Sequence, residues 1–182
     1  NCSMKGSPFI TLPAFDQKSG NLHVIIETPK GCRNKYAFEP DLGLFVLKKV
    51  LPAGSVFPFD FGFIPSTKGE DGDPLDVLVL MDEPAFPGCL VITRLVGAIE
   101  AEQKEKNGKK ERNDRLIAVA DKQETNQHVQ TIQDLPPHTL DQIEHFFISY
   151  NALAGKTFKP LRRQGPKAAR KLVESQMADI KD

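Results

Sequence analysis

Four carboxylates crowd one short stretch of the chain. Glu70, Asp71, Asp73 and Asp76 lie within seven residues, directly before the apolar run 77–81. Acids this close repel one another, so their ionised forms need cations between them unless solvent separates the side chains. Because no His or Cys is nearby, the oxygen ligands favour Mg²⁺, Mn²⁺ or Ca²⁺. The stretch therefore predicts a divalent-cation site held against a rigid strand.

The acidic stretch has two other interpretations. A calcium-binding EF-hand loop needs Gly at its sixth position and Glu at its twelfth. Counted from Asp71, the sixth residue is Asp76, so the EF-hand is excluded. A solvated turn, in which Asp side chains cap their own backbone, remains an alternative from these residues alone.

Basic residues occur in several segments outside the acidic stretch. They are Arg33, Lys35, Lys48, Lys49, Arg112, Arg115, Lys156 and Lys159. Each alone is typical of an exposed surface charge. Together with clustered carboxylates, they supply what phosphoryl chemistry requires, which is positive charge beside phosphate oxygens and metal ions that activate water.

Composition narrows the class of protein. The chain has 182 residues, enough for one domain with a hydrophobic core, and we expect a single domain over 1–182. Its 24 Lys and Arg balance 24 Asp and Glu, so neither nucleic acid nor a membrane is expected as a partner. Three scattered cysteines predict no disulfide framework and favour a cytoplasmic location. No apolar run is long enough to span a bilayer.

The residue pattern predicts a mainly β structure around the acidic stretch. Between residues 22 and 120, short apolar runs alternate with turn residues, as in a sheet or barrel. Strands are expected over 23–27, 35–39, 44–50 and 77–81. We expect segment 1–21 to be extended and segment 121–182 to be mostly helical, with helices over 140–150 and from Pro166 onward.

Several motifs together resemble the signature of the family I soluble inorganic pyrophosphatases. The sequence DGDPLDVLVL begins at Asp71, and FPFDFGFIP occupies 57–65. The family's order is also kept by VIIETP, RNKY, PGCLVITRLVG, RLIAVA and HFFISY, which begin at residues 24, 33, 87, 115 and 145. The resemblance covers roughly residues 22–159.

This resemblance implies a fold, an activity and an assembly. The fold is α+β but mainly β, an OB-like five-stranded β-barrel with flanking C-terminal helices. The activity is hydrolysis of pyrophosphate to two orthophosphates with several Mg²⁺ ions, for which Mn²⁺ is a possible substitute. The expected assembly is a homo-oligomer, with a hexamer favoured by the resemblance.

The resemblance also implies roles for individual residues. Asp71 and Asp76 correspond to metal ligands, and Asp73 corresponds to the carboxylate that accepts a proton from the attacking water. The residues that correspond to phosphate-binding positions, or to a Lys near the metals, are Lys35, Lys49, Tyr150 and Arg115. The remaining site candidates are Glu27, Arg33, Phe61 and Lys156.

The chain departs from the family pattern at several of these positions. The family's usual Glu, Arg, Tyr and Lys are replaced here by Ala37, Lys49, Phe61 and Asn151. Two metal-binding Asp residues expected on a later hairpin correspond to Gln103 and Asn113, which are neutral and poor ligands for Mg²⁺.

The predicted hairpin suggests another residue that could replace the missing carboxylates. Asn107-Gly108 is a strong hairpin signal, and a two-residue turn there pairs Glu102 with Asn113. Strand alternation then turns Glu102, Asn113 and Arg115 to one face and Gln103 to the other. We therefore hypothesise that Glu102 and Asn113 complete the metal site.

Three functions are compatible with these residues. The first is pyrophosphate hydrolysis. The second is hydrolysis of another phosphoanhydride, such as a nucleoside or short-chain polyphosphate, because Ala37 and Phe61 could enlarge the site. The third is a phosphate- or metal-binding module without catalysis, since a fold alone does not establish function. Retention of the acidic stretch together with Lys35 and Tyr150 favours an enzyme.

Overall fold

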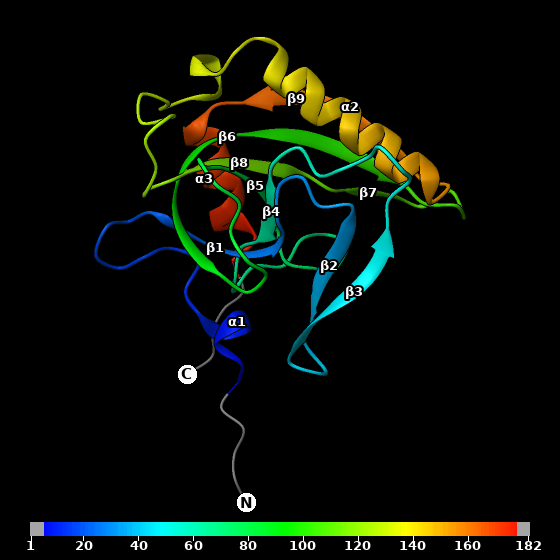
Figure 1. The fold of residues 1–182 in the computed structure, drawn as a ribbon, viewed down its shortest axis with the longest axis horizontal. Helices are drawn as coiled ribbons and strands as arrows, with labels where there is room; N and C mark the ends of the chain where they lie inside the picture. Colours follow the sequence, from blue (N-terminus) through cyan, green and yellow to red (C-terminus); the bar gives the residue numbers. More distant parts are fainter. Residues whose placement is uncertain (1–5, 178–182) are drawn as a thin grey trace, which may run out of the picture.

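Five strands close into a ring in the computed structural model, which describes residues 6–177 (Figure 1). Each strand is hydrogen-bonded to the next, and the last pairs with the first. In order around the ring they are β1 (Leu22–Thr28), β4 (Asp60–Phe63), β5 (Asp76–Leu80), β8 (Arg115–Ala120) and β6 (Leu90–Lys104). The predicted OB-like barrel is confirmed.

Alternation along the barrel strands explains the two halves of the hydrophobic core. Leu78 of β5 and Ile117 of β8 pack in one cluster, whereas their neighbours Val77 and Leu116 pack in the other. Successive side chains of a strand point to opposite faces, so both faces of these strands are covered. This burial accounts for the continuous apolar run that follows the acidic stretch.

Further strands extend or accompany the ring. β7 (Lys110–Arg112) forms a hairpin with the end of β6, and β2 (Asn34–Glu39) pairs with β3 (Leu44–Val50) in a separate two-stranded sheet. β9 (Thr157–Gln164) pairs with β6 within a segment that the sequence predicted to be mostly helical. The 15-residue β6 offers an edge beyond the ring, and β9 is stabilised by pairing with that edge.

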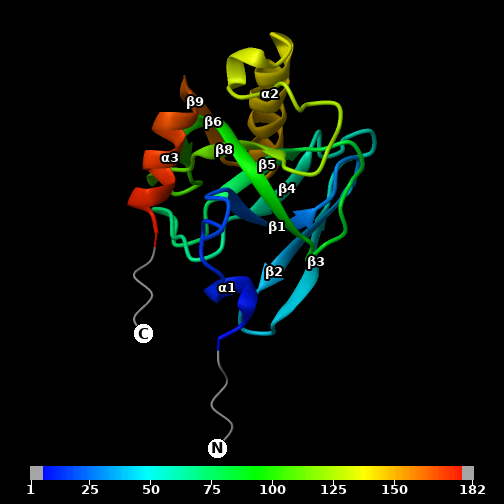
Figure 2. The ribbon, with the colours of Figure 1, turned by 90° about the vertical axis from the view of Figure 1, so that its left-hand side faces the viewer.

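Two helices cover the barrel from different sides. α2 (His138–Leu153) runs beside β9 (Figure 1), and its buried residues include Leu140, Ile143 and Phe147. α3 (Pro166–Ser175) packs against β6 (Figure 2), and its Ala169 and Val173 are buried. The short 3₁₀ helix η1 (Ile132–Asp134) precedes α2.

The segment before the barrel contains a short helix where the sequence predicted an extended chain. α1 (Pro8–Thr11) starts after Ser7, whose side-chain oxygen accepts a hydrogen bond from the Phe9 N–H. Proline at the first helical position favours this start. Among residues 6–177, no helix is both long enough and apolar enough to cross a membrane.

Candidate active site

The acidic stretch forms the connection between β4 and β5. The Ile64 N–H donates to the Leu75 carbonyl at 3.0 Å, so the two strands remain paired up to the loop. Inside the loop, the buried Thr67 hydroxyl donates to the Ile64 carbonyl at 2.6 Å and accepts from the Leu75 N–H at 3.0 Å. These bonds anchor the base of the loop to the barrel.

The tip of this loop is shaped by its own carboxylates. Asp71 Oδ1 accepts a hydrogen bond from the Asp73 N–H at 3.0 Å, and the Asp73 carbonyl accepts from the Gly69 N–H at 2.8 Å. Gly72 between them has φ of +86°, a backbone conformation that other residues rarely adopt. Asp71 and Asp73 are both exposed. The hydrogen bonds hold them in one tight turn.

Asp76 and Arg115 face each other because their strands are neighbours. β5 and β8 are parallel, and Asp76 is paired in register with Arg115. The Arg115 Nη1 lies 2.8 Å from Asp76 Oδ2. The Arg115 side chain is only 5% exposed, and its guanidinium lies over the Phe147 ring, 4.4 Å from the ring centroid. The barrel thus fixes a buried cation beside the acidic stretch.

The small β2–β3 sheet and helix α2 supply further cations and a phenol. Lys35 lies directly opposite Lys49 in the sheet. The Nζ atoms of Lys49 and Lys35 lie 3.9 and 5.4 Å from the centroid of the Tyr150 ring. Burial lowers the pKa of Lys35, but Tyr150, Asp76 and Glu27 outweigh this effect and raise it. Lys35 therefore stays charged at neutral pH.

These groups line a single cavity of about 1160 Å³. Its walls come from the β4–β5 loop, the β2–β3 sheet, the β6–β7 hairpin and α2. The sequence-predicted site residues that line it are Glu27, Lys35, Lys49, Phe61, Asp71, Asp73, Asp76, Asn113, Arg115, Tyr150 and Lys156. Carboxylates thus face cations across one space.

Several carboxyl groups in this cavity resist ionisation. Burial raises the pKa of Glu27 to about 7, although the Phe38 N–H donates to it at 2.8 Å. Although Asp71 is exposed, partial loss of solvent around its carboxyl raises its pKa to about 6, and the charges of Asp76 and Asp73 add to the shift. Burial also raises the pKa of Asp76, against the attraction of Arg115. An added cation would relieve this repulsion.

The acidic loop fits a hard divalent cation by its chemistry. Asp71, Asp73 and Asp76 offer only oxygen ligands, the type that Mg²⁺ takes, and Mg²⁺ commonly uses one or two carboxylates and keeps several waters. Within residues 6–177, no group of three or more His, Cys, Asp or Glu side chains is already gathered around one point.

The β6–β7 hairpin differs from the predicted register by one residue. Glu102 pairs with Arg112 and Gln103 pairs with Glu111, whereas the sequence predicted Glu102 opposite Asn113. The Glu105 N–H bonds the Lys109 carbonyl at 2.8 Å, which leaves a three-residue loop with Gly108 at φ of +87°. Such a loop, common in hairpins, replaces the expected two-residue turn.

This shift turns the β6 side chains of the hairpin to the other face relative to those of β7. Gln103, Glu105, Glu111 and Asn113 line the cavity. Glu102 is not among its lining residues, and its carboxylate lies 3.8 Å from the Lys110 ammonium. A change of one residue in register turns every side chain of one strand to the opposite face relative to its partner strand. The expectation that Glu102 shares a face with Asn113 is therefore wrong.

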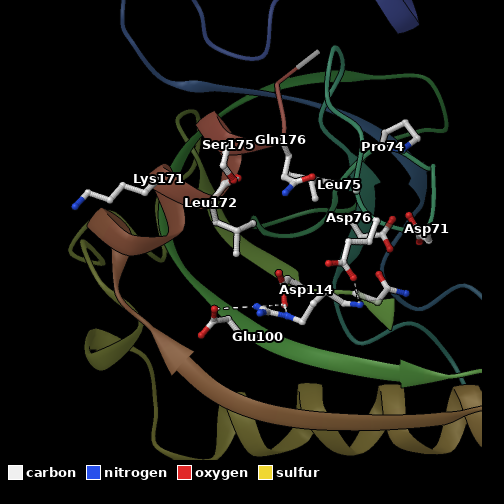
Figure 3. Close-up of a pocket in the computed structure, with 14 residues that line it drawn as sticks. Asp71, Pro74, Leu75, Asp76, Glu100, Asp114, Lys171, Leu172, Ser175 and Gln176 are labelled. Carbon is white, nitrogen blue, oxygen red and sulfur yellow. Dashed lines mark hydrogen bonds and ion pairs between the residues drawn. The ribbon is translucent and has the colours of Figure 1, made fainter. Parts of the chain in front are cut away.

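A smaller pocket of about 350 Å³ lies behind the acidic loop (Figure 3). Glu100 and Asp114 line it together with α3 side chains such as Leu172. Glu100 is held there by ion pairs with Arg112, at 2.8 Å, and with Arg162. These contacts hold Glu100 outside the larger cavity.

Two further predicted residues have distinct positions. Arg33 does not line the cavity, and its Nε donates to the Leu51 carbonyl at 2.7 Å, so it secures the β2–β3 sheet. Lys156 lines the cavity and lies 3.2 Å from the Glu105 carboxylate. Phe61 lies beneath Lys35, whose Nζ is 5.8 Å from its ring centroid.

Comparison with known proteins decides the family. Residues 24–181 match the profile of the family described as inorganic pyrophosphatase. The chain belongs to the inorganic pyrophosphatase family. It is 40% identical over 170 residues to the inorganic pyrophosphatase of Thermus thermophilus, covering 93% of this chain and 94% of the relative. It is 38% identical over 164 residues to that of Nostoc sp., covering 90% and 94%.

Solved structures agree with this membership in the inorganic pyrophosphatase family. The crystal structure of the Thermus thermophilus inorganic pyrophosphatase superposes with a TM-score of 0.83 at 39% identity, covering 93% of this chain and 96% of that one. The Helicobacter pylori inorganic pyrophosphatase gives a TM-score of 0.78 at 33% identity, covering 92% and 95%.

Sequence reasoning missed two carboxylates that this pyrophosphatase-family site contains. Glu105 and Glu111 line the cavity, and neither is among the site residues predicted from the sequence. Both are ion-paired, Glu105 with Lys156 and Glu111 with Lys109 at 2.7 Å. A three-residue loop predicts that Glu105 and Glu111 face the cavity, because all odd-numbered residues of the hairpin then share the face of Gln103.

Proposed function

We propose that this chain hydrolyses inorganic pyrophosphate to two orthophosphates with the help of Mg²⁺. Membership in the inorganic pyrophosphatase family supports the activity. The observation that carries it is that three aspartates of one loop share a cavity with two lysines, a buried arginine and a tyrosine. Negative groups for metal ions and positive groups for phosphates are the two requirements of metal-assisted phosphoryl transfer.

Each side of the cavity has its own part in the reaction. Lys35, Lys49 and Arg115 neutralise the phosphate oxygens, and the Tyr150 hydroxyl donates to them. Asp71 and Asp76 would hold Mg²⁺, which would stabilise negative charge and activate water when bound. Asp73 accepts the proton of the attacking water. The water oxygen bonds to one phosphorus, the bridging P–O bond breaks, and the second orthophosphate leaves.

The direct test is phosphate release from pyrophosphate with and without Mg²⁺. We expect release that depends on Mg²⁺ and that Mn²⁺ partly restores. ATP and tripolyphosphate should be run beside pyrophosphate, because a cavity of about 1160 Å³ with Ala37 in its wall leaves room for a larger phosphoanhydride. Faster release from ATP would favour that second function. No release from pyrophosphate with any divalent metal would contradict the proposal.

We also infer that the chain acts as a homo-oligomer, with a hexamer favoured, and in the cytoplasm. Exposed apolar side chains support association: Leu44, Leu47 and Val50 of β3 are 60%, 55% and 53% exposed, and Leu153 at the end of α2 is 63% exposed. Such side chains are commonly buried between subunits. Light scattering coupled to size-exclusion chromatography would measure the assembly, and a monomer at micromolar concentration would contradict the inference.

A further inference from the structure

The two walls of the cavity differ in the oxygen atoms they offer to a cation. The β4–β5 loop presents Asp71 and Asp73, both exposed carboxylates. The hairpin wall presents the amides of Gln103 and Asn113. Exposed carboxylates are the oxygen ligands that Mg²⁺ binds best, whereas the two carboxylates of the hairpin wall, Glu105 and Glu111, are engaged in ion pairs.

Both amide oxygens of the hairpin wall are already occupied. Gln103 Oε1 accepts a hydrogen bond from Asn113 Nδ2 at 2.7 Å, and Asn113 Oδ1 accepts from Arg115 Nη1. The remaining amide group, Gln103 Nε2, donates to Glu105 Oε1 at 2.9 Å. A cation at this wall would have to compete with a connected hydrogen-bond network and with the Arg115 guanidinium for two neutral amide oxygens.

The nearby carboxylates of this wall are also neutralised. The Lys156 ammonium lies 3.2 Å from Glu105, and the Lys109 ammonium lies 2.7 Å from Glu111. Little uncompensated negative charge is left on the hairpin to attract a divalent ion.

Arg115 brings a permanent positive charge to the place where the two walls meet. One nitrogen, Nη1, bonds both Asp76 and Asn113. Because Phe147 and Phe158 flank the guanidinium, it is held in place and shielded from water. Its charge repels a second cation near Asp76 and attracts phosphate oxygens.

We propose that Arg115 supplies the positive charge on the hairpin side of the active site in place of a divalent cation, and that Gln103 and Asn113 hold it there. Without substrate, metal ions then bind only at the Asp71–Asp76 loop. This inference rests on the proposed function only in assigning metal ions to that loop.

The test counts Mn²⁺ ions bound to the full chain without substrate, by electron paramagnetic resonance and titration calorimetry. The double variant Gln103→Asp/Asn113→Asp restores carboxylates to the hairpin wall and should bind one further Mn²⁺ ion per chain. The matched control, Gln103→Ala/Asn113→Ala, removes the same amides without adding charge and should keep the wild-type count. Circular dichroism verifies that each variant is folded.

Arg115 is tested separately with a charge-removing and a charge-keeping variant. Arg115→Gln frees Asp76 from the guanidinium and should tighten Mn²⁺ binding at least about tenfold, while weakening pyrophosphate binding. Arg115→Lys keeps the charge and should stay closer to wild type in both measurements. An unchanged Mn²⁺ count in the double Asp variant, or unchanged Mn²⁺ affinity in Arg115→Gln, would overturn the proposal.

These measurements are independent of turnover. If wild-type protein releases no phosphate from pyrophosphate but the Mn²⁺ results are as expected, the proposed activity fails and the role of Arg115 stands. If phosphate is released but the double Asp variant gains no Mn²⁺, the activity stands and the role of Arg115 fails.

Discussion

The two walls of the cavity solve the same electrostatic problem in different ways. In the Asp71–Asp76 loop, the carboxylates of Asp71 and Asp73 are exposed, and the pKa of the Asp71 carboxyl is raised to about 6. The hairpin wall neutralises itself internally, through the Gln103–Asn113–Arg115 network and two ion pairs. Under the proposed function, the loop recruits metal ions, and the hairpin side meets phosphate with the fixed charge of Arg115.

The largest effect should follow from replacing Asp76, which belongs to the acidic loop and is also bonded to Arg115. Asp76→Ala should abolish Mg²⁺-dependent activity and weaken metal binding severely. It also leaves Arg115 buried without its carboxylate, which should cost about 3 kcal/mol of unfolding free energy. Phosphate release, calorimetry and urea denaturation measure the three effects. The exposed Asp41→Ala variant serves as a control and should match wild type in each.

The next effect should separate proton transfer from metal binding at the Asp71–Asp76 loop. Asp73→Asn keeps the size of the side chain but removes its ability to take a proton. We expect turnover to fall by about 10²- to 10⁴-fold, the usual contribution of general acid–base catalysis, while Mg²⁺ affinity is largely kept. If Asp73→Asn instead abolished metal binding and Asp76→Ala did not, the two assignments would be reversed.

The stability of the protein should depend on pH because Asp71 and Glu27 resist ionisation in the folded state. The pKa values of Asp71 and Glu27 rise to about 6 and about 7 on folding, so the folded state holds more protons than the unfolded state between about pH 4 and pH 7. The contribution of these groups to unfolding free energy therefore falls as pH rises through that window.

Addition of Mg²⁺ should offset this pH-dependent loss of unfolding free energy. Since metal ions bind the ionised carboxylates, Mg²⁺ should raise the melting temperature more at about pH 8 than at about pH 5. The Glu27→Gln variant loses one of the titrating groups, and its metal-free melting temperature should vary less with pH. A wild-type melting temperature that rises between these pH values in metal-free buffer, with no flattening in Glu27→Gln, would contradict the sign.

The smallest effect is expected on the outer face of the hairpin. Glu102 pairs only loosely with Lys110 and does not line the cavity. Glu102→Ala should therefore change stability by about 0.5 kcal/mol or less and keep wild-type Mn²⁺ binding and pyrophosphate hydrolysis. A large loss of metal affinity would restore Glu102 to the site and contradict the observed register.

Elements with a strong local pattern were predictable from the sequence. The strands over residues 22–28, 34–39, 44–50 and 76–80 and the helices around Ile143 and from Pro166 onward follow the period of their apolar residues. β9 was not predictable in this way. Its Lys159, Arg162 and Arg163 give no apolar alternation, and its stability comes from pairing with β6, which is distant in the chain.

The sequence by itself determined the acidic loop and the family motifs, because neighbouring residues carry both and a short loop keeps them together. The tertiary structure decided which residues face them. A single residue in the hairpin loop set the register of β6 and β7, and that register placed Gln103 and Asn113 in the cavity and Glu102 outside it. The parallel pairing of β5 with β8 brought Arg115 to Asp76 across 39 residues of chain, a contact that no local pattern encodes.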